Sequence, residues 1–155
     1  WTQMIIYRKD LFEEAGLEPV MHTQPRGEPW PTLREMIESG RRVVALTDDG
    51  GGASPWLMAV WDFAWETNWS IESRDQFTCE ATGRGSQDND LFIFNHFVTR
   101  PWANESIASE INTKDYLLTR AENCQEESGQ RINFVSVDFY ASGDTLEVVR
   151  LLNGL

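Results

Sequence analysis

Three apolar segments of the sequence end in side chains that could take part in chemistry. Asp138 and Tyr140 close the segment INFVSVDFY, Asn95 and His96 stand near the end of LFIFNHFV, and Asp48 ends RVVALTD. Carboxylate, amide, imidazole and phenol groups bind polar substrates and transfer protons. A polar end on an apolar strand is typical of α/β folds, which place their sites at the carboxyl ends of parallel strands.

Each of these side chains also has an ordinary structural interpretation. Asp138 could cap the helix that follows it, Asp48 begins the common turn composition Asp-Asp-Gly, and His96 could be a buried histidine satisfied by hydrogen bonds. The other histidine, His22, lies in a segment flanked by proline and glycine, and we interpret it as a surface residue. The residue types alone leave these alternatives open.

The segment 132–140 is expected to be a strand with one polar and one apolar side. Side chains alternate between the two faces of a strand. One side would carry Phe134, Ser136, Asp138 and Tyr140, and the other Val135, Val137 and Phe139. We therefore expect a helix to pack on the second side, and we expect the polar side to present Asp138 and Tyr140 together.

Helical patterns precede and separate the expected strands. They cover residues 2–15, 32–40 and about 105–124, and a last one follows Gly143-Asp144; residues 49–90 are expected to be irregular. Strands joined by helical crossovers must be parallel, and near-continuous apolar strands indicate burial on both faces. Three strands cannot close an eight-stranded barrel, so the sequence predicts either a small open α/β domain or the carboxyl-terminal part of a barrel.

Bulk properties narrow the class of protein. The 155 residues suit one domain, and the chain opens Trp1-Thr2-Gln3 without an initiator Met, so we expect it to be part of a larger protein. No run approaches the ~20 apolar residues of a membrane span. The net charge of −12 argues against non-specific nucleic-acid binding and against a polybasic lipid-binding surface.

The two cysteines and two glycosylation sequons bear on the compartment. Cys79 and Cys124 fit no zinc or redox motif, and they are either one disulfide of an exported protein or two unrelated thiols. Sequons begin at Asn68 and Asn104. Together these features favour an extracellular or membrane-associated protein.

Several short sequences occur in a familiar order. They are WPTLREMI at 30–37, RG at 84–85, LFIFNHF at 91–97, NFVSVDFY at 133–140, GD at 143–144 and LNG at 152–154. With this order and spacing, the chain from about residue 11 to its end resembles the PLC-like phosphodiesterases, and more narrowly proteins related to the phosphatidylinositol-specific phospholipase C X domain. The resemblance implies a partial TIM-type (β/α) barrel, with residues 1–155 as its carboxyl-terminal portion and the amino-terminal strands absent.

The resemblance implies cleavage of an inositol phospholipid or a related phosphodiester. Two histidines act as general base and general acid in that family, but they come from early strands that nothing in this sequence matches. We therefore expect the chain alone to be inactive and the activity to belong to the parent protein. The alternatives are a non-catalytic relative that binds phosphoinositides or glycans and a complete small α/β interaction domain.

The resemblance also implies roles for individual residues. Asp138 matches the strand-end aspartate that orients a catalytic histidine, and Tyr140 would bind a phosphate, stack on a sugar ring or pack at the barrel rim. His96, Asn95 and Asp48 are further candidates for substrate binding. Arg84 would approach a phosphate or lie in solvent as a loop arginine.

The expected partners follow from the resemblance, from the aromatic residues and from the net charge. They are a phospholipid or other phosphodiester substrate and, through an aromatic series, a peripheral membrane contact, with no nucleic acid. The series is Trp56, Trp61, Phe63, Trp65 and Trp69, which would either dip into lipid or pack the long connection onto the barrel. We expect no cofactor. Some relatives use calcium, but the sequence has no calcium-loop motif, so the alternatives of a calcium-dependent and a metal-free reaction both stay open.

Overall fold

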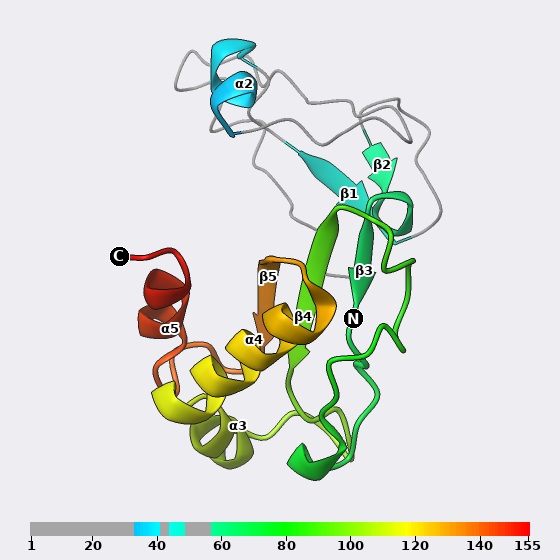
Figure 1. Cartoon of the computed structure of the whole chain (residues 1–155). Helices are drawn as coiled ribbons and strands as arrows, with labels where there is room; N and C mark the ends of the chain where they lie inside the picture. The colour runs from blue at the N-terminus through cyan, green and yellow to red at the C-terminus, as the bar shows by residue number, and fades with distance from the viewer. Residues whose placement is uncertain (1–32, 41–43, 49–56) are drawn as a thin grey trace, which may run out of the picture. The chain divides into compact units, whose positions relative to one another are not determined.

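The structure is a computed structural model, and it describes residues 33–40, 44–48 and 57–155 (Figure 1). The helix expected over residues 2–15, His22 and Trp56 lie outside the described residues. The chain divides into two compact units, Trp1–Phe63 and Ala64–Leu155. Each unit is described by itself.

The first unit contains a short helix and two short parallel strands. Helix α2 spans Leu33–Glu38 and is followed by Gly40, which has a left-handed φ of 74°. Strand β1 (Ala45–Thr47) pairs in parallel with β2 (Leu57–Ala59), and the 3₁₀ helix η1 (Val60–Asp62) follows. The predicted helix over 32–40 and the predicted strand over 42–48 are therefore confirmed, with shorter bounds.

The second unit is built on a three-stranded parallel sheet. Its strands are β3 (Ala64–Glu66), β4 (Leu91–His96) and β5 (Ile132–Val137), in the order β3-β4-β5. The 3₁₀ helix η2 (Arg74–Gln76) lies between β3 and β4, helices α3 (Glu105–Ile111) and α4 (Lys114–Ser128) connect β4 to β5, and α5 (Thr145–Leu152) follows β5. The predicted parallel pairing with a helical crossover is confirmed for β4 and β5. The predicted strand over 42–48 does not join them, because β1 pairs with β2 in a separate two-stranded sheet.

The structure differs from the predicted irregular segment over 49–90 and from the predicted helix over 105–124. Residues 49–90 are not irregular throughout, because they contain β2 and β3. Each of these strands has three residues, too few for an alternating pattern to be recognised. The single helix predicted over 105–124 is two helices that meet at Asn112 and Thr113, and the second one continues to Ser128.

The core lies between the sheet and the helices that follow its strands. Trp65 of β3 stacks on Phe92 of β4 with ring centroids 3.9 Å apart, and Val135 of β5 packs on the same cluster. The fully buried members of the cluster are Trp65, Phe92, Phe94, Leu117, Ala121, Cys124 and Val148. We call this face of the sheet the helix side (Figure 1). The prediction that helices cover the apolar side of β5 is confirmed at Val135.

The strand register assigns the polar side chains to the other face. Glu66 pairs with Ile93, and Asn95 pairs with Ser136. Because neighbouring strands keep paired residues on the same face, Glu66, Asn95 and Ser136 lie on the side opposite the helices. We call this face the opposite side.

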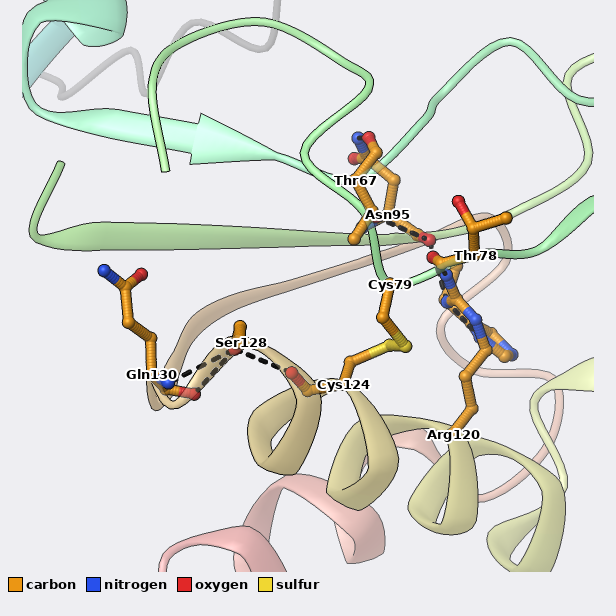
Figure 2. The surroundings of a disulfide bond; sticks show 9 residues. Thr67, Thr78, Cys79, Asn95, Arg120, Cys124, Ser128 and Gln130 are labelled. Carbon is orange, nitrogen blue, oxygen red and sulfur yellow. Dashed lines mark hydrogen bonds between the residues drawn. A yellow bond between two sulfur atoms is a disulfide. The ribbon is translucent and has the colours of Figure 1, made fainter. Parts of the chain in front are cut away.

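A disulfide joins Cys79 to Cys124 and ties the segment after η2 to α4 (Figure 2). The two cysteines are therefore bonded to each other and are not two unrelated thiols. No helix in the part of the chain that the structure describes is both long and apolar enough to cross a membrane.

Candidate functional site

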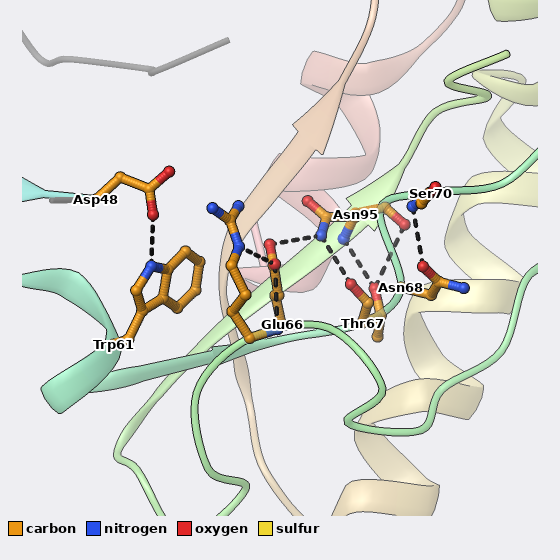
Figure 3. A network of polar contacts seen from close by, with 8 residues as sticks. Asp48, Trp61, Glu66, Thr67, Asn68, Ser70 and Asn95 are labelled. Carbon is orange, nitrogen blue, oxygen red and sulfur yellow. Dashed lines mark hydrogen bonds and ion pairs between the residues drawn. The ribbon is translucent and has the colours of Figure 1, made fainter. Parts of the chain in front are cut away.

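A buried carboxylate marks the carboxyl end of β3 on the opposite side of the sheet. Glu66 is the last residue of the strand and is only 2% exposed. Its Oε1 accepts hydrogen bonds from Nε of Arg84 at 2.7 Å and from the backbone N–H of Arg84 at 3.2 Å (Figure 3). A buried carboxylate needs such partners, because an unpaired charge in the interior is unstable.

Two glycines allow the segment around Arg84 to lie directly against β3. The N–H of Glu66 donates to the carbonyl of Arg84 at 3.0 Å, and the N–H of Gly83 donates to the carbonyl of Glu66 at 3.3 Å. A Cβ on Gly83 would lie 2.9 Å from the carbonyl oxygen of Thr67, and one on Gly85 would overlap the carbonyl oxygen of Ala64. The Gly-Arg-Gly sequence therefore places Arg84 beside Glu66.

Asn95 connects this carboxylate to β4. Its Nδ2 donates to Oε2 of Glu66 at 2.9 Å and to the carbonyl oxygen of Thr67 at 2.8 Å, and its backbone N–H donates to Oγ1 of Thr67 at 3.0 Å. Asn95 is 4% exposed and Thr67 is fully buried. We call Glu66, Thr67, Arg84 and Asn95 the Glu66 cluster; Figure 3 labels Glu66, Thr67 and Asn95.

The Glu66 cluster brings a guanidinium to the carboxyl ends of β3 and β4. The Arg84 side chain is 44% exposed although its carboxylate partner is buried, and its guanidinium carbon lies 5.8 Å from the centre of the Trp69 ring. A guanidinium is planar, remains charged and matches the geometry of phosphate oxygens. The arrangement can therefore bind an anionic group at this edge of the sheet.

Asp138 follows the last residue of β5 and is partly buried. It borders a small hollow that is lined mainly by apolar residues of α3 and of the segment after β4, among them Val98, Ile107 and Ile111. Burial raises the pKa of the Asp138 carboxyl above its ordinary value. The residue that precedes α5 is Asp144, and its carboxylate accepts from the N–H of Lys114 at the start of α4.

Tyr140 is 65% exposed and lies in the turn between β5 and α5. The strand was predicted to continue to Tyr140, but it ends at Val137, and Phe139 has a left-handed φ of 50°. The strict alternation of side chains therefore stops before Tyr140. The expectation that strand geometry alone would pair Asp138 with Tyr140 was wrong in this respect.

His96 lies on the helix side and is fully buried. Its Nε2 is 2.9 Å from the carbonyl oxygen of Ile111, its Nδ1 is 3.1 Å from a guanidinium nitrogen of Arg120, and its ring stacks on Phe77. Burial, with the Arg120 charge as a smaller cause, lowers the pKa of His96 to about 4. This geometry matches the buried, hydrogen-bonded histidine that was the alternative to a substrate-binding role.

Asp48 belongs to the first unit, directly after β1. Its Oδ1 accepts from the indole N–H of Trp61 at 2.5 Å (Figure 3). Within the aromatic series, Trp65 is a core residue, whereas Trp69 is 42% exposed. Packing, the alternative to lipid contact, therefore applies to Trp65.

Glu66 was not recognised from the sequence, because it lay in a stretch that was expected to be irregular. The sequence marks Glu66 only weakly. Its carboxylate directly follows Ala64 and Trp65, which are buried, and a Gly-Arg-Gly sequence occurs further along the chain. Among the residues that the structure describes, no three His, Cys, Asp or Glu side chains are grouped so that they could hold a metal ion together.

Comparison with known proteins identifies a protein family that this chain matches. The family model of the PI-PLC X domain matches residues 4–153. A PI-PLC X domain-containing protein of Arabidopsis thaliana is 27% identical over 165 aligned residues, which cover 93% of this chain and 36% of the relative. PI-PLC X domain-containing protein 1 of Arthroderma benhamiae is 25% identical over 81% of this chain and 45% of the relative.

A third relative is an uncharacterized secreted protein of Arthroderma benhamiae, 26% identical over 83% of this chain and 34% of that protein. The chain thus spans between 34% and 45% of the length of these curated relatives. No solved structure gives a significant match. The family match extends over nearly the whole chain, and the chain belongs to the PI-PLC X domain family.

Proposed function

We propose that the protein containing this chain is a phosphoric diester hydrolase of the phospholipase C type that acts on an inositol phospholipid or a related phosphodiester. Membership of the PI-PLC X domain family supports the reaction class. Because the chain spans less than half of its curated relatives, the activity is proposed for the longer protein rather than for these residues alone.

The observation that carries the proposal is the set of polar groups at one edge of a parallel sheet. Glu66, Arg84 and Asn95 lie at the carboxyl ends of β3 and β4, and Asp138 directly follows the neighbouring strand β5. In (β/α) barrels this edge carries the active site. We propose that β3, β4 and β5 are consecutive strands of such a TIM-type barrel, whose other strands come from the rest of the protein.

Each group has a part in this proposal. Asp138 would accept a hydrogen bond from a histidine supplied by the rest of the protein, fix its tautomer and stabilise the imidazolium that forms when it takes a proton. Arg84, held by Glu66, would stabilise negative charge on the phosphate oxygens in the transition state. Tyr140 would donate its phenol hydrogen to the phosphate.

We further propose that the protein is exported. The Cys79–Cys124 disulfide supports this, since disulfides persist in oxidising compartments. The printed name of one relative from Arthroderma benhamiae also describes a secreted protein.

The test is hydrolysis of phosphatidylinositol in detergent micelles by the full-length protein, measured as release of water-soluble inositol phosphate. We expect Asp138→Asn to lower kcat by about 10²–10⁴-fold, the usual contribution of positioned proton transfer. Asp75→Asn, on the exposed 3₁₀ helix η2, is the matched control. A protein that binds phosphatidylinositol vesicles but releases no inositol phosphate would contradict the proposal and would favour the non-catalytic relative.

A further inference from the structure

The turn that carries Asp138 and Tyr140 is held by a side chain from another element. Asn112, fully buried just after α3, donates from Nδ2 to the carbonyl oxygens of Asp138 at 2.9 Å and Ser142 at 3.2 Å. Its own carbonyl oxygen accepts from the N–H of Asp144 at 2.8 Å. Three hydrogen bonds therefore tie residues 138–144 to this single asparagine.

The contact between the turn and Asn112 is also close in space. Gly143 has a left-handed φ of 99°, and a Cβ built on it would lie 2.6 Å from the carbonyl oxygen of Asn112 and 2.8 Å from its Cβ. Only glycine combines this backbone conformation with so close an approach. The turn therefore fits against Asn112 in one specific arrangement.

The turn contains a residue in a conformation that its side chain disfavours. Phe139, between the two candidate site residues, has a φ of 50°, which is uncommon for a bulky residue. Such a conformation persists where surrounding contacts enforce it. Asn112 fixes the carbonyl just before Phe139, and the N–H of Ser142 donates to the carbonyl of Phe139 at 2.7 Å.

An asparagine at position 112 destabilises the fold in one respect, so its presence calls for a reason beyond packing. Its Oδ1 is buried and has no hydrogen-bond partner among the residues that the structure describes. Burying an unsatisfied acceptor destabilises a fold, and an apolar residue of similar shape would avoid that cost. The two donor bonds from Nδ2 are what an apolar residue could not replace.

We propose that Asn112 is a positioning residue, which holds Asp138 and Tyr140 in the turned conformation that the reaction requires. The inference rests on the proposed phosphodiesterase function, because it assigns Asp138 and Tyr140 to the site of that reaction. Asn112 acts through the backbone of the turn and is not itself assigned a contact with the substrate.

The test compares Asn112→Leu with the wild type in the full-length protein. Leucine keeps a similar volume and removes both donor bonds. We expect kcat for phosphatidylinositol to fall about 10²-fold with KM nearly unchanged, as a displacement of roughly 1 Å at a catalytic group produces. The limb of the pH–rate profile that depends on Asp138 should also shift. Asn133→Ala, which removes the bond from the N–H of Phe92 near the amino end of β5, should leave both unchanged.

Hydrogen exchange gives a readout that does not need activity. In Asn112→Leu, the amides of Ser142 and Asp144 should exchange at least about tenfold faster, while the amides of β4 keep their protection. If Asn112→Leu does not fold, Gly143→Ala displaces the turn from the other side with Asn112 intact, and the same local loss is expected.

The outcomes separate the two proposals. An inactive wild type whose turn loses protection in Asn112→Leu would reject the phosphodiesterase function and retain the positioning role of Asn112 in the turn. Unchanged protection in Asn112→Leu would overturn that role. Lost protection with unchanged kcat and pH profile would overturn its consequence for the reaction.

Discussion

Strand β4 separates two polar clusters that differ in what they leave exposed. On the helix side, His96 and Arg120 are buried among aromatic rings. On the opposite side, the Glu66 cluster contains a buried carboxylate but brings the half-exposed guanidinium of Arg84 to the edge of the sheet. Both clusters contain an arginine, and the difference in exposure distinguishes a structural arginine from one that can meet a ligand.

The helix-side arginine is held by three acceptors of the protein. Arg120 donates to the carbonyl oxygens of Asn95 at 2.9 Å and Thr78 at 3.0 Å (Figure 2). It also donates to Nδ1 of His96 at 3.1 Å. Its guanidinium carbon lies 4.2 Å from the ring centres of both Phe77 and Phe94. Burial lowers the pKa of Arg120 to about 10, so the residue stays charged at neutral pH.

The two clusters meet at Asn95. Arg120 binds the backbone carbonyl of Asn95 from the helix side. The side chain of Asn95 donates to Glu66 on the opposite side. The structural cluster therefore supports the candidate site across the strand. We therefore expect substitutions in the helix-side cluster to lower stability more than substitutions in the Glu66 cluster.

The largest expected loss of stability is for Arg120→Met. The substitution leaves three acceptors without their donor and removes two cation–π contacts, and breaking a buried charged network costs about 3–5 kcal/mol. The free energy of unfolding from urea titration measures it. Arg74→Met, on an exposed 3₁₀ helix, is the control and should change stability by about 0.5 kcal/mol or less. Equal losses for the two variants would show that the helix-side cluster is not a structural one.

The next largest loss of stability is expected on removal of the Cys79–Cys124 disulfide. Cys79 directly follows Thr78, whose carbonyl oxygen accepts from Arg120. Cys79 and Cys124 are separated by 45 residues, and closing a loop of that length stabilises the folded state by about 2–4 kcal/mol. The double variant Cys79→Ser, Cys124→Ser should lose that amount in urea titration. Adding reductant to the wild type should reproduce the loss, and adding it to the double variant should have no effect. A loss in the double variant without a loss on reduction would contradict the assignment.

The sequence predicted the elements whose signals are local. The long apolar strands β4 and β5 and the helices preceding Gly40 and Gly129 could be recognised, because each has enough residues for a period and a clear end. The break at Asn112 could not, since apolar residues continue at helical spacing on both sides of it. The residue at this break, Asn112, is bound to the distant turn at Asp138 and Ser142, a contact that no local pattern reveals.

The site was predicted only in part for the same reason. Glu66 depends on Arg84, which lies 18 residues further along the chain, and no period in the sequence reveals that contact. The position of His96 could have been predicted, because alternation along β4 places it on the same side as the core residues Phe92 and Phe94. The roles of Asp138 and Tyr140 remain predictions.

His96 makes the stability of the helix-side cluster dependent on pH. The pKa of His96 is lowered from 6.5 to about 4 in the folded protein, so between these values the unfolded chain binds more protons. Stability is therefore highest above pH 6.5 and falls by up to about 3 kcal/mol as the pH drops toward 4. Because carboxylates titrate in the same window, the quantity to measure is the difference in pH slope between the wild type and His96→Gln. Parallel slopes would contradict the prediction.

The smallest loss of stability is expected for a substitution in the Glu66 cluster, and that substitution should lower activity instead. Glu66→Gln keeps the shape of the side chain and removes the charge that holds Arg84. Because the Arg84 side chain is 44% exposed and solvent screens its charge, we expect a stability loss of only about 1 kcal/mol. The kcat of the full-length protein should nevertheless fall about tenfold or more, since Arg84 would lose the charged contact with Glu66 that helps to position it at the phosphate.

Glu72→Gln is the matched control for this last comparison, because it removes the carboxylate of the ion pair with Arg100, in which both side chains are more than 60% exposed. Neither stability nor kcat should change in that variant. If Glu66→Gln behaved like Glu72→Gln in both measurements, the buried ion pair would have no role beyond that of a surface pair. The Glu66 cluster would then not be part of the active site, and Asp138 would be the remaining residue of this chain that supports the proposed function.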